Sequence, residues 1–136
     1  MGGIFQPAKD PGPVTAGQLA ALNFAKANKT QSAWTVPNFE NGWGEFSPIF
    51  PVGYFVDDFG FCHLRGLVSA GIVGVDIFNI PFQLSHEGST RYATASDNLF
   101  GVALAERNGS GGTLIRAAVG SSAWFSLDGI VFQVNV

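Results

Sequence analysis

The chain has 136 residues and a mass of 14.3 kDa, with hydrophobic residues at 46% and charged residues at only 12%. Charged residues usually make up about 25% of a soluble domain, so a monomer of this composition would expose an excess of apolar surface. The seven basic residues are scattered and the net charge is −3, which excludes a basic surface for nucleic acid. No run approaches the roughly 20 apolar residues of a membrane-spanning helix, so we expect self-association and no membrane insertion.

Residues 1–14 predict an extended leader. Pro11 and Pro13 stand on either side of a glycine and favour an extended backbone. Ile4 and Phe5 are apolar residues that favour docking onto another surface. We expect this leader to be an anchor in a larger assembly, and no secretory signal is visible in it.

The next segment, up to residue 33, predicts a short helix and a linker. Thr15 is a suitable N-cap, and Ala16 to Asn28 is rich in alanine and has no proline. Leu19 and Leu22 lie three residues apart on one helical face, but this apolar stripe ends one turn later. A stripe this short favours packing on a neighbouring chain or in a small three-helix bundle.

Residues 34–136 predict a β-sandwich domain. Glycine, aromatic and β-branched residues become frequent, and helical periodicity disappears. Turn signals such as Asn108-Gly109 and Asp128-Gly129 separate short strands at fairly even intervals. The expected strands are Trp43–Ser47, Gly53–Asp57, Phe61–Ala70, Gly74–Ile80, Arg91–Ala95, Leu99–Glu106, Thr113–Val119 and Ile130–Val136. This pattern predicts a mostly β, antiparallel, jelly-roll-like sandwich.

The alternation of side chains along a strand predicts which of them face the core. In the strand that begins at residue 61, the predicted core positions are Cys62, Leu64, Gly66 and Val68. In the last strand they are Ile130, Phe132, Val134 and Val136. The single cysteine, Cys62, is therefore predicted to be a core thiol. His63 and Arg65 lie on the opposite face beside Phe and Leu, which indicates a half-buried polar contact, and we identify both as candidates for a subunit interface.

The apparent catalytic and metal-binding signals have simpler structural explanations. Asp58-Phe59-Gly60 matches the metal-binding tripeptide of kinases, but the Gly-rich loop and strand lysine that should precede it are missing, so a hairpin turn is predicted. His63 and His86 have no set of cysteines or carboxylates at zinc-ligand spacing. No serine lies in a Gly-x-Ser-x-Gly elbow, and the acids that could pair for glycoside cleavage lie in predicted turns. We expect no enzyme, no cofactor and no metal site.

Landmark residues from Trp34 to the C-terminus follow one another in a recognisable order. They are Trp34-Thr35-Val36-Pro37, Asn41-Gly42-Trp43, Pro51-Val52-Gly53-Tyr54-Phe55, Asp58 to Val68, Gly71-Ile72-Val73-Gly74, Ile77-Phe78-Asn79-Ile80-Pro81 and Ala123 to Phe132. This order resembles the C-terminal β-sandwich of bacteriophage tail-fibre, minor tail and baseplate-type proteins, which commonly form trimers. The chain departs from that family after Pro81, where Phe82-Gln83-Leu84-Ser85 replaces a loop of the Gly-Tyr-Arg-Pro type.

The resemblance implies a virion structural protein, made in the host cytoplasm, that forms a homotrimeric knob on the particle. The knob would stand on a tail tip or fibre, or serve as a head decoration or head fibre. The leader would join it to other virion proteins, and a host-surface glycan is a further expected partner. One alternative is a soluble carbohydrate-binding module that stacks sugars on exposed aromatic side chains. A depolymerase is a second alternative, but the repeated solenoid strands typical of such enzymes are missing from the sequence.

Overall fold

The computed structural model describes residues 15, 16 and 33–136. The chain divides into two units, Met1–Gln31 and Ser32–Val136, of which the second carries nearly all the described residues. Ala16 is helical. The remainder of the predicted helix and the leader, with the anchor residues Ile4, Phe5, Leu19 and Leu22, lie outside the described residues.

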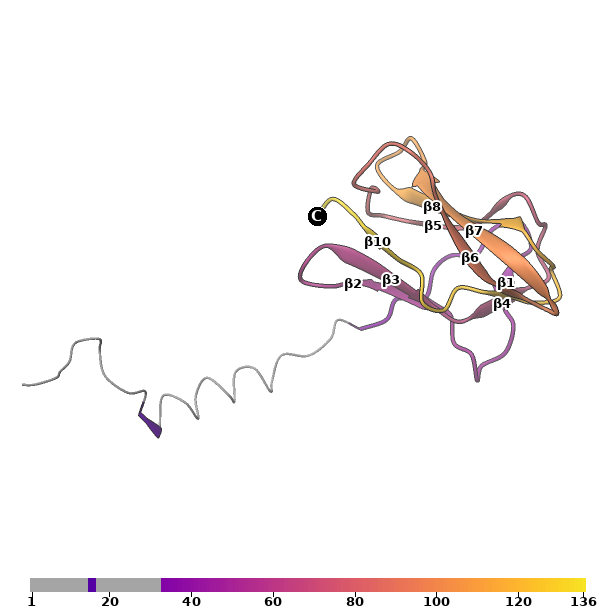
Figure 1. Ribbon diagram of the computed structural model, residues 1–136, viewed down its shortest axis with the longest axis horizontal. Helices are drawn as coiled ribbons and strands as arrows, with labels where there is room; N and C mark the ends of the chain where they lie inside the picture. Colours follow the sequence, from indigo (N-terminus) through magenta and orange to yellow (C-terminus); the bar gives the residue numbers. More distant parts are fainter. Residues whose placement is uncertain (1–14, 17–32) are drawn as a thin grey trace, which may run out of the picture. The chain divides into compact units, whose positions relative to one another are not determined.

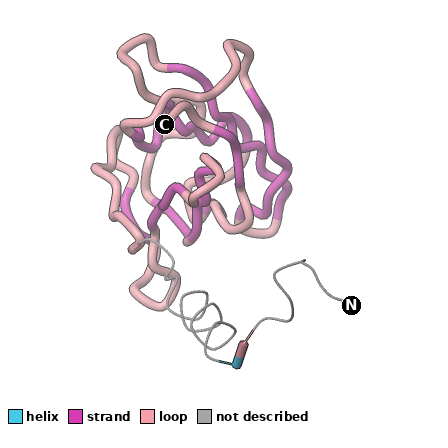
Figure 2. Tube along the Cα trace, turned by 90° about the vertical axis from the view of Figure 1, so that its left-hand side faces the viewer, coloured by secondary structure: helices cyan, strands magenta, loops and turns pink. Residues whose placement is uncertain are grey.

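The second unit is mostly β, as the sequence predicts, and residues 33–136 contain no helix (Figure 2). Its ten strands are β1 Gly44–Glu45, β2 Gly53–Val56, β3 Phe61–Arg65, β4 Leu67–Ser69, β5 Asp76–Ile80, β6 Thr90–Ser96, β7 Leu99–Arg107, β8 Thr113–Val119, β9 Phe125–Ser126 and β10 Val131–Gln133. Each predicted strand overlaps an observed one. The short strand β9 was missed, because it follows a polar loop and pairs through only two residues.

The strands form antiparallel sheets arranged as a β-sandwich-like fold (Figure 1). One layer consists of two three-stranded sheets, with the orders β10-β3-β2 and β1-β4-β9, and the other is a four-stranded sheet with the order β5-β8-β7-β6. In the latter sheet β6, β7 and β8 follow one another as hairpins and β5 returns beside β8, which is a Greek-key arrangement. Thr94 on β6 donates a 2.9 Å hydrogen bond to the Ser126 carbonyl on β9, which ties the two layers together.

The predicted strand Phe61–Ala70 is interrupted at Gly66, where β3 ends and β4 begins. Gly66 has a φ of +99°, outside the extended region. Its amide donates to the Asp128 carboxylate at 2.7 Å, and its carbonyl accepts from the Leu127 amide at 2.8 Å. The turn before β10 therefore takes the hydrogen bonds that a continuous ladder would have used at this point.

The core follows the predicted alternation. Cys62, Leu64 and Val68 are buried, while the alternate residues of β3 and β4 are half-buried or exposed. Burial raises the pKa of the Cys62 thiol to about 12, so this residue is an unreactive core thiol as predicted. In the last strand the prediction is wrong for Val136, which is 85% exposed, because the last β-bridge joins Leu84 to Val134, two residues before it.

Candidate functional site

Two parts of the surface of residues 33–136 contain the predicted interface residues or the most exposed aromatic side chain. One is a row of stacked rings on the outward side of β2 and β3, and the other is an apolar group on the β6–β7 hairpin. The first contains the predicted interface residues His63 and Arg65. The second was not singled out from the sequence.

The stacked row, defined by Arg65, Trp34, Phe55, His63 and Asp57, begins where the chain enters the sandwich. The Arg65 guanidinium lies 4.3 Å from the centre of the Trp34 ring, a cation–π distance. Trp34 meets Phe55 edge to face with 4.6 Å between ring centres. Phe55 is stacked almost parallel on the His63 imidazole, also at 4.6 Å, because the two residues pair directly across β2 and β3.

His63 ends the row with a contact to Asp57, whose Oδ2 lies 2.8 Å from the imidazole Nε2. The other carboxylate oxygen of Asp57 accepts hydrogen bonds from the backbone amides of Phe59 and Phe61, at 2.9 and 3.0 Å. The hydrogen bond from His63, and then that from the Phe61 amide, lower the pKa of Asp57 below its ordinary value of 3.8. The polar contact predicted for His63 is therefore made within the chain.

Asp57→Asn is expected to weaken the dependence of stability on acid pH. Because the folded state favours the carboxylate, the stabilisation is complete above pH 3.8 and is lost as the pH falls through the lower pKa of the folded chain. Asparagine has no charge to lose. The urea midpoint of unfolding of the Asp57→Asn variant should therefore differ less between pH 7 and pH 3 than that of the wild type. His63→Gln should change the wild-type pH dependence in the same direction, and an unaltered dependence in both variants would contradict this account.

Arg65 lies at the opposite end of the row from His63. Its Nε is buried and has no hydrogen-bond acceptor within residues 33–136, so its contact with Trp34 offsets part of the desolvation cost. His63 and Arg65 thus both have partners in the same chain, Asp57 and Trp34. Their role in a subunit interface stays a prediction.

The row has no arrangement for nucleophilic catalysis. His63 and Asp57 form an acid–imidazole pair, but within residues 33–136 no hydrogen bond joins His63 to the side chain of a serine, threonine or cysteine. In the same residues no group of three or more His, Cys, Asp and Glu side chains is placed to hold a metal ion. No described helix has the length and apolar character needed to cross a membrane.

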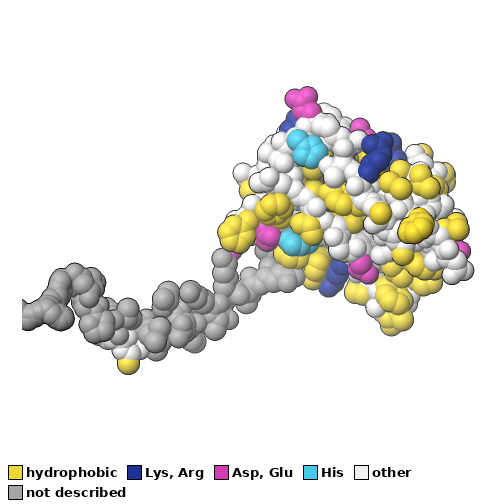
Figure 3. All heavy atoms as spheres, in the orientation of Figure 1, with side chains coloured by type: hydrophobic (Ala, Val, Ile, Leu, Met, Phe, Trp, Pro, Cys, Tyr) yellow, Lys and Arg dark blue, Asp and Glu magenta, His cyan; other side chains and the backbone are white. Residues whose placement is uncertain are grey.

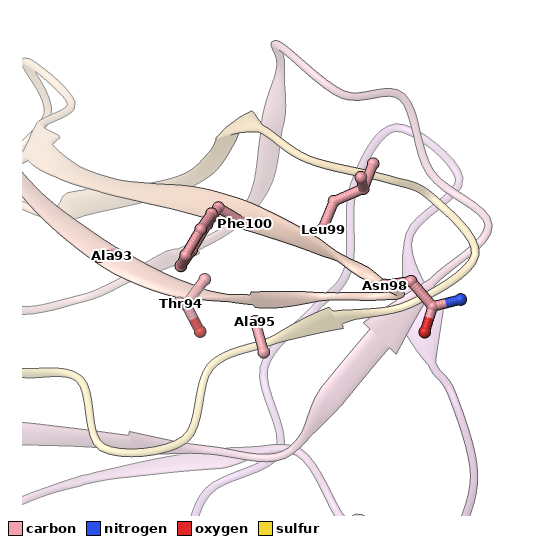
Figure 4. A pocket seen from close by; sticks show the side chains of 6 residues that line it. All are labelled: Ala93, Thr94, Ala95, Asn98, Leu99 and Phe100. Atoms are coloured by element: carbon pink, nitrogen blue, oxygen red, sulfur yellow. The ribbon is translucent and has the colours of Figure 1, made fainter.

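The apolar group on the β6–β7 hairpin is centred on Phe100, which is 87% exposed beside Leu99 at 63%. The ladder sets Phe100 directly opposite Ala95, and a groove of about 490 Å³ runs along this hairpin (Figure 4). On β8, Val119 pairs with Val102 of β7 and is 56% exposed. Figure 3 shows hydrophobic side chains gathered over β7 and the hairpin, with a further group on the loop between β1 and β2.

The sequence does carry a signal for this surface. Leu99 and Phe100 are consecutive large apolar residues that start a strand directly after the Asp97-Asn98 turn. Since neighbouring residues of a strand point to opposite faces, both cannot face one core. The strand was predicted, but the consequence for Phe100 needed the position of its partners in the sheet.

Comparison of the chain with protein-family models, with curated proteins and with solved structures found no match.

Proposed function

We propose that this protein is a structural and binding component of a bacteriophage particle, in which its β-sandwich forms a homotrimeric knob. The observation that carries the assembly part is the exposed apolar surface around Phe100. The Phe100 side chain is 87% exposed, so it leaves a large apolar area in contact with water. Covering this area with another protein surface is favourable. Between Arg91 and Glu106 the β6–β7 hairpin carries one charged residue, Asp97, so little charge would be buried in such a contact.

The assignment to a phage particle is supported by the order of sequence landmarks from Trp34 onwards. These landmarks fall on the strands and turns of the sandwich: the Phe61 to Val68 segment forms β3 and β4, and Ile77 to Ile80 lies in β5. The jelly-roll topology, the trimer and the leader as an anchor to other virion proteins belong to the same proposal. The Greek key in the four-stranded sheet supports the topology in part.

A role without catalysis is part of this proposal. It is supported by the His63–Asp57 pair, which is stacked against Phe55 and bonded within a turn. This pair holds the outward side of the sheet together and presents no nucleophile. The knob would act through the surfaces that it offers to other chains and to the host.

Phe100→Asp is expected to convert the oligomer into a monomer. A carboxylate at this position cannot be buried against a partner without a large desolvation cost. Light scattering on the purified wild type should give a mass of about 43 kDa, three times the chain mass of 14.3 kDa, and the variant should fall to the mass of one chain. Phe59→Asp is the matched control, because Phe59 is 78% exposed in the turn between β2 and β3, away from the hairpin.

A wild-type protein that is monomeric would remove the trimer and favour the second candidate function, a soluble carbohydrate-binding module. A trimer that survives Phe100→Asp would move the interface to another face. A specific observation favours glycan binding as well: a polar pocket, lined by asparagine side chains and lying apart from the hairpin.

A further inference from the structure

A pocket of about 450 Å³ lies between the segment 35–38, the end of β5 and the loop that joins β7 to β8. Its volume is within the range of small-molecule sites, about 300–1,000 Å³. The residues that line it come from four separate parts of the chain. Its polar side chains are those of Thr35, Asn38, Tyr54, Asn79, Asn108 and Ser110.

Two of the three asparagine side chains of this pocket, Asn79 and Asn108, are held in place before any ligand binds. Asn108 Nδ2 donates to Asn79 Oδ1 at 2.8 Å, and Asn79 Nδ2 donates to the Glu40 carboxylate at 3.0 Å. Asn108 Oδ1 accepts the backbone amides of Ser110 and Gly112, at 2.8 and 3.0 Å. A ligand therefore meets fixed amides and does not have to order them, which lowers the entropic cost of binding.

Tyr54 adds a hydroxyl that is open to a ligand. The residue lines the pocket and is only 8% exposed. A phenol in this position both donates and accepts. The hydroxyl is not a buried unpartnered group, so water solvates it in the free protein, and a ligand hydroxyl can replace that water.

Gly112 keeps the floor of the pocket open. A Cβ atom built at this position would collide with the Ile80 carbonyl and would lie 2.8 Å from Asn108 Nδ2. Only glycine lets the β7–β8 loop approach the end of β5 so closely without covering the Asn108 amide. The close approach of the loop and the exposed amide are thus produced by the same residue.

The character of the lining limits the class of ligand. None of the lining residues is an acid, a base or a histidine, so a phosphate, a carboxylate or a metal ion would find no compensating charge. Val36 and Pro81 add apolar surface beside the amides. A neutral molecule with several hydroxyl groups and apolar ring faces fits this combination. A ligand hydroxyl can accept from the second N–H of Asn79 or Asn108, and it can donate to Asn79 Oδ1, whereas Asn108 Oδ1 already accepts two amides.

We propose that this pocket binds a single neutral sugar unit of a glycan, with Tyr54, Asn79 and Asn108 as its hydrogen-bonding residues. The proposal rests on the glycan-binding part of the proposed function and is independent of the trimer.

The test titrates the full-length ¹⁵N-labelled chain with glucose, galactose, mannose and N-acetylglucosamine and follows the amide resonances by NMR. At least one sugar should shift the side-chain amide signals of Asn79 and Asn108. Tyr54→Phe should lower the affinity for that sugar about tenfold, since the change removes one hydrogen bond of a desolvated site. The fold should stay intact because the aromatic ring remains. Tyr92→Phe is the matched control: its hydroxyl donates to the Val131 carbonyl at 3.1 Å, outside the pocket, and sugar binding should be unaltered.

The following results would overturn the proposed sugar site. Shifts at these amides with a blocked dipeptide, and none with sugars, would make the pocket a peptide site. A lack of shifts with every sugar, or equal affinity in wild type and Tyr54→Phe, would remove the site. Light scattering on the same sample separates the two proposals, because a trimer that binds no sugar refutes only the pocket, whereas a monomer that binds sugar refutes only the trimeric knob.

Discussion

Leu64→Asp is expected to leave no folded protein at neutral pH. Leu64 is 3% exposed in β3, between Cys62 and the strand break at Gly66, and it packs in the core shared by both layers. The change removes the burial of a leucine, worth about 2–5 kcal/mol, and places a carboxylate where no partner can reach it. Together these costs approach the whole stability of a domain of this size, about 5–15 kcal/mol.

Phe61→Asp is the matched control for Leu64→Asp, because Phe61 belongs to the same strand and points to the opposite, outward face, where it is 38% exposed. Circular dichroism and the yield of soluble protein should show a folded Phe61→Asp chain and an unfolded or aggregated Leu64→Asp chain. The reverse result would mean that the register of β3 is shifted by one residue, since such a shift exchanges the two faces.

Gly66→Ala is expected to destabilise the sandwich by about 4 kcal/mol or more, because a steric collision in the core and backbone strain are both among the causes of losses of this size. A Cβ atom at Gly66 would lie 2.5 Å from the Pro51 carbonyl oxygen and 2.6 Å from the Val52 Cα, both backbone atoms that cannot move aside. The φ of +99° adds the strain of a conformation that side chains disfavour.

Gly74→Ala separates the two causes. Gly74 has a φ of +100°, nearly the same as that of Gly66, but no atom lies within 4 Å of the position of its Cβ. We expect it to cost only the backbone strain, about 1–2 kcal/mol. Urea unfolding of both variants measures the difference, and equal losses would show that the contact of Gly66 with the Pro51-Val52 segment contributes nothing.

The strand positions and the inward faces could be read from the sequence because both depend on a local pattern. Alternation of apolar and polar residues and turn residues such as Asp128-Gly129 act over a few positions of the chain. Residues 61–68 show this clearly, since the inward positions that the alternation predicts are the buried ones. Similarly, the half-buried character of His63 and Arg65 follows from a polar side chain standing between apolar ones on the same face.

The partners of those side chains could not be read in the same way. Trp34 contacts Arg65, and Asn79 is hydrogen-bonded to Asn108, which lies 29 residues further along the chain. Both contacts form because the sheets bring distant segments together. The same reason applies to the break at Gly66, which depends on Asp128, 62 residues further on. No window of the sequence contains both members of such a pair.

The local pattern of this chain thus sets its β class, its strands, its turn residues and the side of each strand that enters the core. The three-dimensional arrangement sets which apolar residues stay uncovered, as at Phe100, and which amides meet around one pocket, as at Asn79 and Asn108. The physical reason is that burial and polar pairing depend on neighbours in space, and in a sandwich with antiparallel sheets and a Greek-key connection most of those neighbours are remote in the sequence.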